Sequence, residues 1–87
     1  MQLQDQCVIQ ILKFLDKALE KNPSVSFNDV MAAPKCKKYS VKEIGQALEL
    51  LRRNKLVKAT SKFGCSELLE FNSTMVTPEG KEFLKNN

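Results

Sequence analysis

Apolar side chains recur at helical spacing in the first part of the chain. Over residues 5–20, one face of a helix would carry Val8, Ile11, Leu12, Leu15, Ala18 and Leu19. Cys7, Ile9 and Phe14 lie beside this stripe, and Pro23 ends the helix because proline cannot continue it. The pattern predicts a helix with more apolar surface than one packing partner covers. Such a helix is either central to the core or part of a dimer contact, and we favour the core.

Two short elements are predicted before the middle of the chain. The alternation over residues 25–27 is typical of a brief strand. Asn28 or Ser26 can then cap a short helix over residues 29–33, which Pro34 stops.

The clearest local signal is a helix start at Ser40. Residues 40–43 have the pattern of a capping box, in which the N-cap Ser and a Glu three positions later satisfy backbone N–H groups at the helix start. A helix over residues 41–53 follows, with Asn54 as the expected left-handed residue at its end. By spacing, its core side is predicted to carry Val41, Ile44, Ala47, Leu48 and Leu51. Its solvent side is predicted to carry Lys42, Gln46, Glu49 and Arg53.

The last third predicts a hairpin. Residues 56–60 have the composition of a strand, and Gly64 is the expected point of chain reversal. Residues 66–71 suit either a strand, with extension to Val76, or a single helical turn, and their length and neighbours favour the strand.

A final helix is predicted over residues 78–85. Thr77 supplies its N-cap, Pro78 its first residue and Glu79 an acid in its first turn. Two apolar side chains are expected to pin it to the core: Phe83 and Leu84.

The composition excludes several classes of protein to which this chain could belong. With 87 residues, of which 43% are hydrophobic, the chain suits one globular domain, residues 1–87, and it has no apolar run long enough for a membrane helix. Histidine, the commonest general base and metal ligand, is absent. The chain contains neither a Cys-x-x-Cys pair nor a glycine-rich phosphate loop. With no signal-peptide pattern, we expect a cytoplasmic protein that is not an enzyme and uses no metal or cofactor.

The three cysteines are expected to be free thiols, buried or half-buried. Cys36 is the one thiol with basic neighbours, Lys35, Lys37 and Lys38, which would lower its pKa and make it reactive. No base or oxyanion-binding group lies near it in the sequence, so a catalytic role is not favoured.

Positive charge is concentrated in the middle of the chain. Residues 35–62 contain nine Lys and Arg against two Glu, a net charge of +7, whereas the other 59 residues carry a net charge of −3. The overall charge of +4 therefore hides a basic centre, which is typical of a phosphate-facing surface. Glu43 and Glu49 on the central helix, and Glu67 and Glu70 in the hairpin, oppose that interpretation.

Three stretches in this order resemble the winged helix-turn-helix superfamily. Residues 39–44 (YSVKEI) resemble the start of a recognition helix, residues 48–57 (LELLRRNKLV) the passage from that helix into the wing, and residues 75–84 (MVTPEGKEFL) the exit from the wing. The resemblance covers nearly the whole chain and is greatest to small stand-alone proteins of bacteria and phages, many of them uncharacterised. It implies an α+β fold with a three-helix core, a β-hairpin wing and a C-terminal helix.

The same resemblance implies double-stranded DNA as the partner, with the capped helix in the major groove and the wing against the backbone. The candidates for base edges are Ser40, Lys42 and Gln46. The candidates for phosphates are Lys37, Lys38, Arg53, Lys58 and Lys62.

We therefore expect a DNA-binding transcriptional regulator or accessory factor. One small module reads few base pairs, so a homodimer through the first or last helix would serve specificity. The alternative is a winged-helix module that docks a protein partner without binding DNA, which the mixed charges favour.

Overall fold

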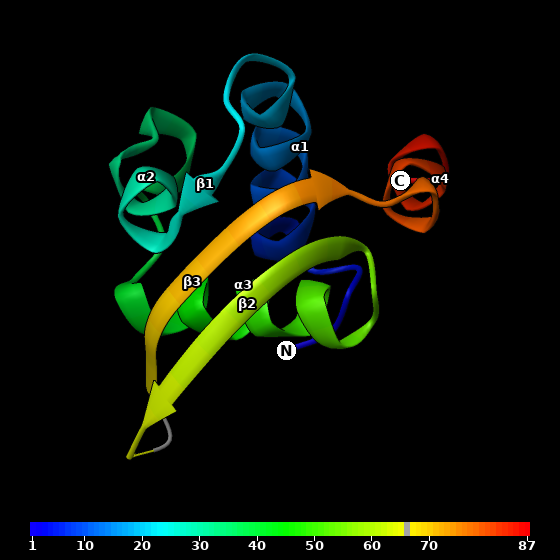
Figure 1. Cartoon of the computed structure of the whole chain (residues 1–87). Helices are drawn as coiled ribbons and strands as arrows, with labels where there is room; N and C mark the ends of the chain where they lie inside the picture. The colour runs from blue at the N-terminus through cyan, green and yellow to red at the C-terminus, as the bar shows by residue number, and fades with distance from the viewer. Residues whose placement is uncertain (66) are drawn as a thin grey trace.

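The computed structural model describes residues 1–65 and 67–87. Within them, three α-helices precede a β-hairpin and a fourth helix follows it, and a short first strand joins the hairpin in one sheet (Figure 1). The α-helices are α1 (Gln6–Lys21), α2 (Phe27–Ala32), α3 (Val41–Arg53) and α4 (Pro78–Lys85). A 3₁₀ helix, η1 (Pro34–Cys36), links α2 to α3, and the strands are β1 (Val25–Ser26), β2 (Val57–Gly64) and β3 (Glu67–Val76).

Helix α1 is the centre of the core. Four residues of its apolar stripe are buried as the spacing predicted, whereas Ala18 and Leu19 are half-buried, and α1 packs against α3, β3 and α4. Cys7 and Ile9, beside the stripe, are also buried, and Phe14 is half-buried against the core cluster. Packing inside the protein therefore accounts for the extra apolar surface of this helix.

The short second helix begins earlier than its cap residues suggested. Ser26, one of the two predicted N-caps, accepts a hydrogen bond from the Asp29 backbone N–H at 3.3 Å, and the Asp29 carboxylate accepts one from the Ser26 N–H at 2.9 Å. This second capping box makes Phe27 the first helical residue, so α2 covers Phe27–Ala32 and not residues 29–33. Pro34 then starts η1, because its φ and missing N–H suit the first position of a helix.

Helix α3 starts as predicted and ends differently. At its start, the Ser40 Oγ accepts from the Glu43 N–H at 3.1 Å, and the Glu43 carboxylate accepts from the Ser40 N–H at 3.0 Å. At its end, Asn54 stays near helical geometry, with φ −88°, because its side-chain amide donates to the Leu50 carbonyl at 2.8 Å. The left-handed residue is Lys55, with φ 59°, and not the predicted Asn54.

Strand β3 is central in the antiparallel sheet, with β1 on one side and β2 on the other. The segment that could have been a helical turn is thus strand from Glu67 onward, and residue 66 lies outside the described residues. Gly64 is the last residue of β2, paired with Glu67, and the left-handed residue at the hairpin is Cys65, with φ 51°. The prediction that Gly64 makes the reversal was therefore wrong by one position.

Helix α4 closes the end of the sheet opposite the hairpin tip (Figure 1). It covers the predicted residues and uses Thr77 as its N-cap, whose Oγ1 accepts from the Gly80 N–H at 3.1 Å. The same hydroxyl donates to the Lys55 carbonyl at 2.6 Å, and Lys81 forms an ion pair with Asp16 of α1 at 3.1 Å. Phe83 and Leu84 pack against the core, half-buried, as expected.

Candidate nucleic-acid interface

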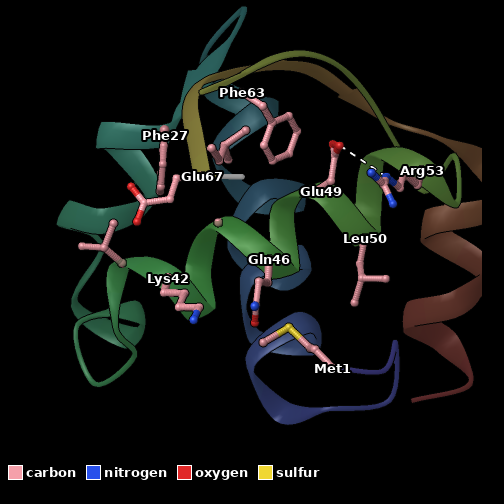
Figure 2. Close-up of a pocket in the computed structure, with 12 residues that line it drawn as sticks. Met1, Phe27, Lys42, Gln46, Glu49, Leu50, Arg53, Phe63 and Glu67 are labelled. Carbon is pink, nitrogen blue, oxygen red and sulfur yellow. Dashed lines mark ion pairs between the residues drawn. The ribbon is translucent and has the colours of Figure 1, made fainter. Parts of the chain in front are cut away.

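The outward face of α3 lies in an open groove of about 530 Å³. The helix contributes polar side chains to it, the β2–β3 hairpin forms one wall through Phe63 and Leu68, and Met1 lies near Gln46 on the other side (Figure 2). The hairpin is therefore a wing that stands beside the central helix, and the groove between them is the concave surface of this part of the molecule.

Two of the three base-edge candidates line this groove. Lys42 and Gln46 are exposed and project from α3 into it (Figure 2). Ser40 is also exposed, at the start of the helix, but its Oγ is engaged by the Glu43 N–H and it does not line the groove.

The phosphate candidates before α3 lie on the surface between η1 and the helix. Lys37 and Lys38 are both exposed. The Lys38 ammonium lies 5.2 Å from the centroid of the Tyr39 ring, a distance suited to a cation–π contact. Tyr39 itself is half-buried against the core, so it supports this turn from beneath.

The wing lysines face away from the α3 groove. Along β2, Ser61 and Phe63 face α3, whereas Lys58, Thr60 and Lys62 alternate with them and are exposed. Lys62 lines a second concavity of about 430 Å³, together with residues of β3 and of the start of α2. The structure thus leaves Lys58 and Lys62 outside the groove that Lys42 and Gln46 share.

Two residues of α3 contradict their predicted burial. Val41, expected in the core, is 60% exposed and lines the open groove. Glu49, expected in solvent, is only 7% exposed, because the wing strand β2 covers it. The spacing of apolar residues along α3 could not predict either exposure, because each depends on which other elements pack against the helix.

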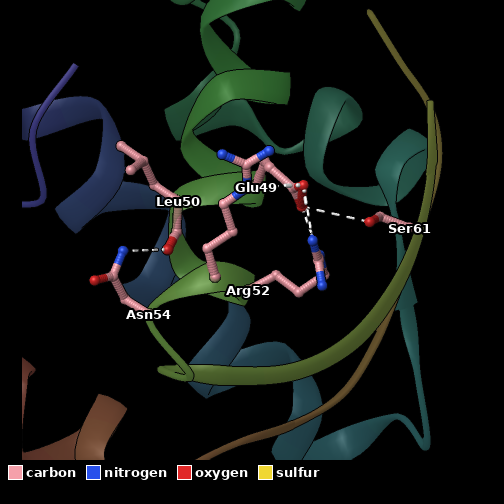
Figure 3. Close-up of polar contacts among 6 residues, drawn as sticks. Glu49, Leu50, Arg52, Asn54 and Ser61 are labelled. Atoms are coloured by element: carbon pink, nitrogen blue, oxygen red, sulfur yellow. Dashed lines mark hydrogen bonds and ion pairs between the residues drawn. The ribbon is translucent and has the colours of Figure 1, made fainter. Parts of the chain in front are cut away.

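The buried Glu49 carboxylate is the centre of a charged cluster at the joint of α3 and β2. Arg52 donates to it twice, from Nε to Oε1 at 2.5 Å and from a terminal nitrogen to Oε2 at 2.9 Å. The Arg53 Nε lies 3.4 Å from Oε2 (Figure 2), and the Ser61 hydroxyl donates to Oε1 at 3.4 Å (Figure 3). The Arg52 hydrogen bonds hold the pKa of Glu49 below its usual value, against the opposing effect of burial.

Arg53, the remaining phosphate candidate, is part of this cluster and also lines the groove. The sequence analysis predicted neither the pairing of Arg53 with Glu49 nor the contact of Glu49 with Ser61. The spacing of Glu49 from Arg52 and Arg53, three and four residues, was a usable signal for the helical ion pairs. Nothing in the sequence indicated the contact between Glu49 and Ser61, which are twelve residues apart.

The wing carries exposed apolar and acidic side chains. Phe63 is 43% exposed and Leu69 56% exposed. Glu67 and Glu70 are exposed on β3, and Glu70 stands opposite Lys62 in the register. The wing as a whole is therefore less basic than the sequence charge of residues 35–62 implied.

Two of the three cysteines, Cys7 and Cys36, are buried, whereas Cys65 is exposed and not buried or half-buried as expected. Cys36 is fully buried despite its lysine neighbours, and burial raises its pKa, so the predicted lowering was wrong. Burial also raises the pKa of Cys7, to about 11. Over residues 1–65 and 67–87, no group of three or more Cys, Asp and Glu side chains is arranged to hold a metal ion.

Comparison with solved structures identifies the fold. The chain superimposes with a TM-score of 0.61 on a solved structure described as a transcriptional regulator homologue from Pyrococcus horikoshii OT3, over 97% of this chain and 74% of that one. The sequences are 20% identical over this match. The fold is a winged helix, in the α+β class: α1, α2 and α3 form the helical core and β2–β3 the wing.

At the level of sequence, no family model and no curated protein matches the chain. Among the residues that the structure describes, no helix has both the length and the apolar character needed to cross a bilayer.

Proposed function

We propose that this protein is a DNA-binding regulator that presents α3 to the major groove. The observation that carries the proposal is the outward face of α3 on a winged-helix scaffold, where Lys42 and Gln46 are exposed in one groove. Lysine donates to guanine acceptors and glutamine pairs with adenine, so these two side chains are suited to base edges. The similarity to a transcriptional regulator homologue supports this choice among the functions that the fold can serve.

Exposed cations at both ends of α3 supply the backbone contacts in this proposal. Lys37 and Lys38 flank its start, and Arg53 lies in its last turn. Lys58 and Lys62 extend the positive surface along the wing, on a different face. Four to six phosphate contacts would give a log–log salt slope of about −4 to −5.

A single module of this size reads few base pairs, so the proposal includes a homodimer. The half-buried apolar side chains of α1 and α4, among them Phe14 and Phe83, are where we propose to look for its contact.

Fluorescence anisotropy with a random duplex tests the proposal. We expect binding at about 50 mM salt that weakens steeply by about 200 mM salt. The double variant Lys37→Ala/Lys38→Ala should reduce the salt slope by about 1.8, whereas Lys17→Ala, an exposed lysine on α1, should leave it unchanged. Lys42→Ala and Gln46→Ala should reduce discrimination among selected sequences. Absence of any binding at about 50 mM salt would refute the proposal.

One observation favours a second candidate function, a module that docks a protein partner. Phe63 and Leu69 are exposed on the wing, and Glu67 and Glu70 are exposed beside them. Exposed apolar side chains with mixed charges are typical of a protein interface more than of a phosphate contact. If this function holds, Phe63→Ser weakens capture of a partner from cell extract while the Lys37→Ala/Lys38→Ala variant does not.

A further inference from the structure

The cluster around Glu49 joins the two parts of the molecule that a DNA duplex would contact. Glu49 belongs to the third turn of α3, and Ser61 belongs to β2 of the wing. The hydroxyl of Ser61 donates to the same carboxylate oxygen, Oε1, that accepts from the Arg52 Nε. One buried carboxylate therefore links the wing strand β2 to α3 through a hydrogen bond.

The two arginines in the cluster differ in how tightly they are held. Arg52 makes two parallel hydrogen bonds to Glu49, and its side chain is 36% exposed. Arg53 has one longer contact, 3.4 Å from Nε to Oε2, and its side chain is 70% exposed. Two-point arginine–carboxylate pairs are the stronger and more specific kind, whereas exposed single contacts contribute little.

We propose that Glu49 is a positioning residue for the protein–DNA contact and that the two arginines it binds have different roles. Glu49 and Arg52, with Ser61, lock the wing against α3. Arg53 is turned toward the groove and is released to a backbone phosphate when DNA binds. The proposal rests on the DNA-binding function proposed above.

The charges of the cluster favour the transfer of Arg53 from Glu49 to a phosphate. Removing the only partner of a buried carboxylate is costly, because the charge is left without compensation. Here, the Arg52 pair remains when Arg53 leaves, so Glu49 stays paired and hydrogen-bonded throughout. A phosphate is a good acceptor for the forked guanidinium group of Arg53, so the released side chain gains a partner of the same kind as the one it loses.

A set of single variants tests the division of roles. Arg53→Ala should reduce the salt slope of DNA binding by about 0.9 and leave backbone hydrogen exchange in β2 unchanged. Arg53→Lys, which keeps the charge, should restore the slope. Arg52→Ala should accelerate exchange at Ser61 and Lys62 by about tenfold, because Glu49, the residue of α3 that Ser61 contacts, loses the paired hydrogen bonds that hold its carboxylate in place. Arg52→Lys, a milder change, serves if Arg52→Ala fails to fold.

The sign of the effect at Glu49 separates positioning from simple electrostatics. Glu49→Gln removes a negative charge from the DNA-facing side, so electrostatics alone predicts tighter binding. Positioning predicts weaker binding together with faster exchange in β2. Glu67→Gln is the matched control, because this exposed wing acid lines the same groove and its loss should tighten binding or leave it unchanged.

The outcomes are distinguishable from failure of the proposed function. If the wild-type protein binds no duplex, the DNA-binding function is refuted, and the inference about Arg53 falls with it. If the wild-type protein binds DNA but Glu49→Gln binds more tightly, with unchanged exchange in β2, the inference about Glu49 is overturned and DNA binding stands. Equal effects of Arg52→Ala and Arg53→Ala on exchange and on salt slope would overturn the division of roles.

Discussion

Gly80, in the first turn of α4, lies directly against the carbonyl group of Leu56. A Cβ atom built on Gly80 would overlap the Leu56 carbonyl oxygen and would approach Cγ1 of Val76 to 2.9 Å. The same turn is tied to the backbone before β2, since the Thr77 N–H donates to the Leu56 carbonyl at 3.0 Å. Helix α4 therefore docks by contact between backbones, for which a residue without a side chain is needed.

We predict that Gly80→Ala destabilises the protein by about 2–3 kcal/mol, because the obstacle is backbone and cannot rotate away. Urea titration followed by circular dichroism measures the change. Gly64→Ala is the control: the three atoms nearest to its Cβ all belong to the exposed, flexible side chain of Leu69, with Cδ1 closest at 2.6 Å, so little change is expected. Equal losses in the two variants would contradict the backbone contact.

A second prediction concerns the end of α3. Lys55 has φ 59°, its N–H donates to the Arg52 carbonyl at 3.1 Å, and the Leu56 N–H donates to the Leu51 carbonyl at 3.0 Å. These are the two hydrogen bonds of a Schellman motif, in which the left-handed residue is usually glycine. Lys55→Gly should stabilise the protein by about 0.5–1 kcal/mol in urea titration, since it removes the steric penalty of the left-handed conformation.

Asn54→Gly is the companion variant. It removes the hydrogen bond from the Asn54 amide to the Leu50 carbonyl at a residue with φ −88°, so it should destabilise the protein. A stabilising Asn54→Gly together with a neutral Lys55→Gly would show that the helix ends one residue earlier in solution.

The third prediction concerns thiol reactivity. Cys65 is exposed, whereas Cys7 and Cys36 are buried and burial raises the pKa of each. With a thiol-specific reagent at mildly alkaline pH, one equivalent should react rapidly. The other two should react more than about a hundredfold more slowly, because they require local opening of the structure. Cys65→Ser should abolish the rapid phase, and a rapid phase that survives it would contradict the burial of Cys36.

The fourth prediction follows from the lowered pKa of Glu49. The Arg52 hydrogen bonds favour the charged carboxylate in the folded protein, whereas in the unfolded chain the pKa returns toward 4.5. The contribution to stability is therefore complete above about pH 4.5 and declines as the pH falls through the lower folded value.

The measurement is the difference in the free energy of unfolding between the wild-type protein and Glu49→Gln, from about pH 6 down to about pH 3. We expect the advantage of the wild type to shrink on acidification, because protonated Glu49 no longer pairs as an ion with Arg52. A difference that grows toward low pH would mean that the pKa of Glu49 is raised and that burial outweighs the arginines.

Much of the secondary structure was predictable because its signals are local. The Ser40 capping box, the Thr77-Pro78 start of α4 and the proline after α1 each act on residues within one turn. The predicted boundaries were wrong by one or two residues where two local signals competed. At the start of α2, both Ser26 and Asn28 can cap, and only Ser26 has an acid at the right distance to complete the box.

The candidate site was less predictable. Lys42 and Gln46 were placed correctly on the exposed face of α3, because that face is set by the helical period. The separation of Lys62 from them could not be predicted, since it depends on which face of β2 turns toward α3. A shift of one residue in strand register would exchange the two faces.

By itself, the sequence determined where α3 and α4 begin, which stripe of α1 is apolar, that the chain has a basic centre, and that histidine chemistry is absent. Only the tertiary structure decided that Glu49 is buried, that Val41 is exposed, and that Ser61 reaches the Glu49 carboxylate. The reason is physical. Caps, breakers, periodicity and ion pairs within one helix act through neighbours in the chain, whereas burial and the Ser61 contact depend on what a distant element, here the wing, brings to the same place.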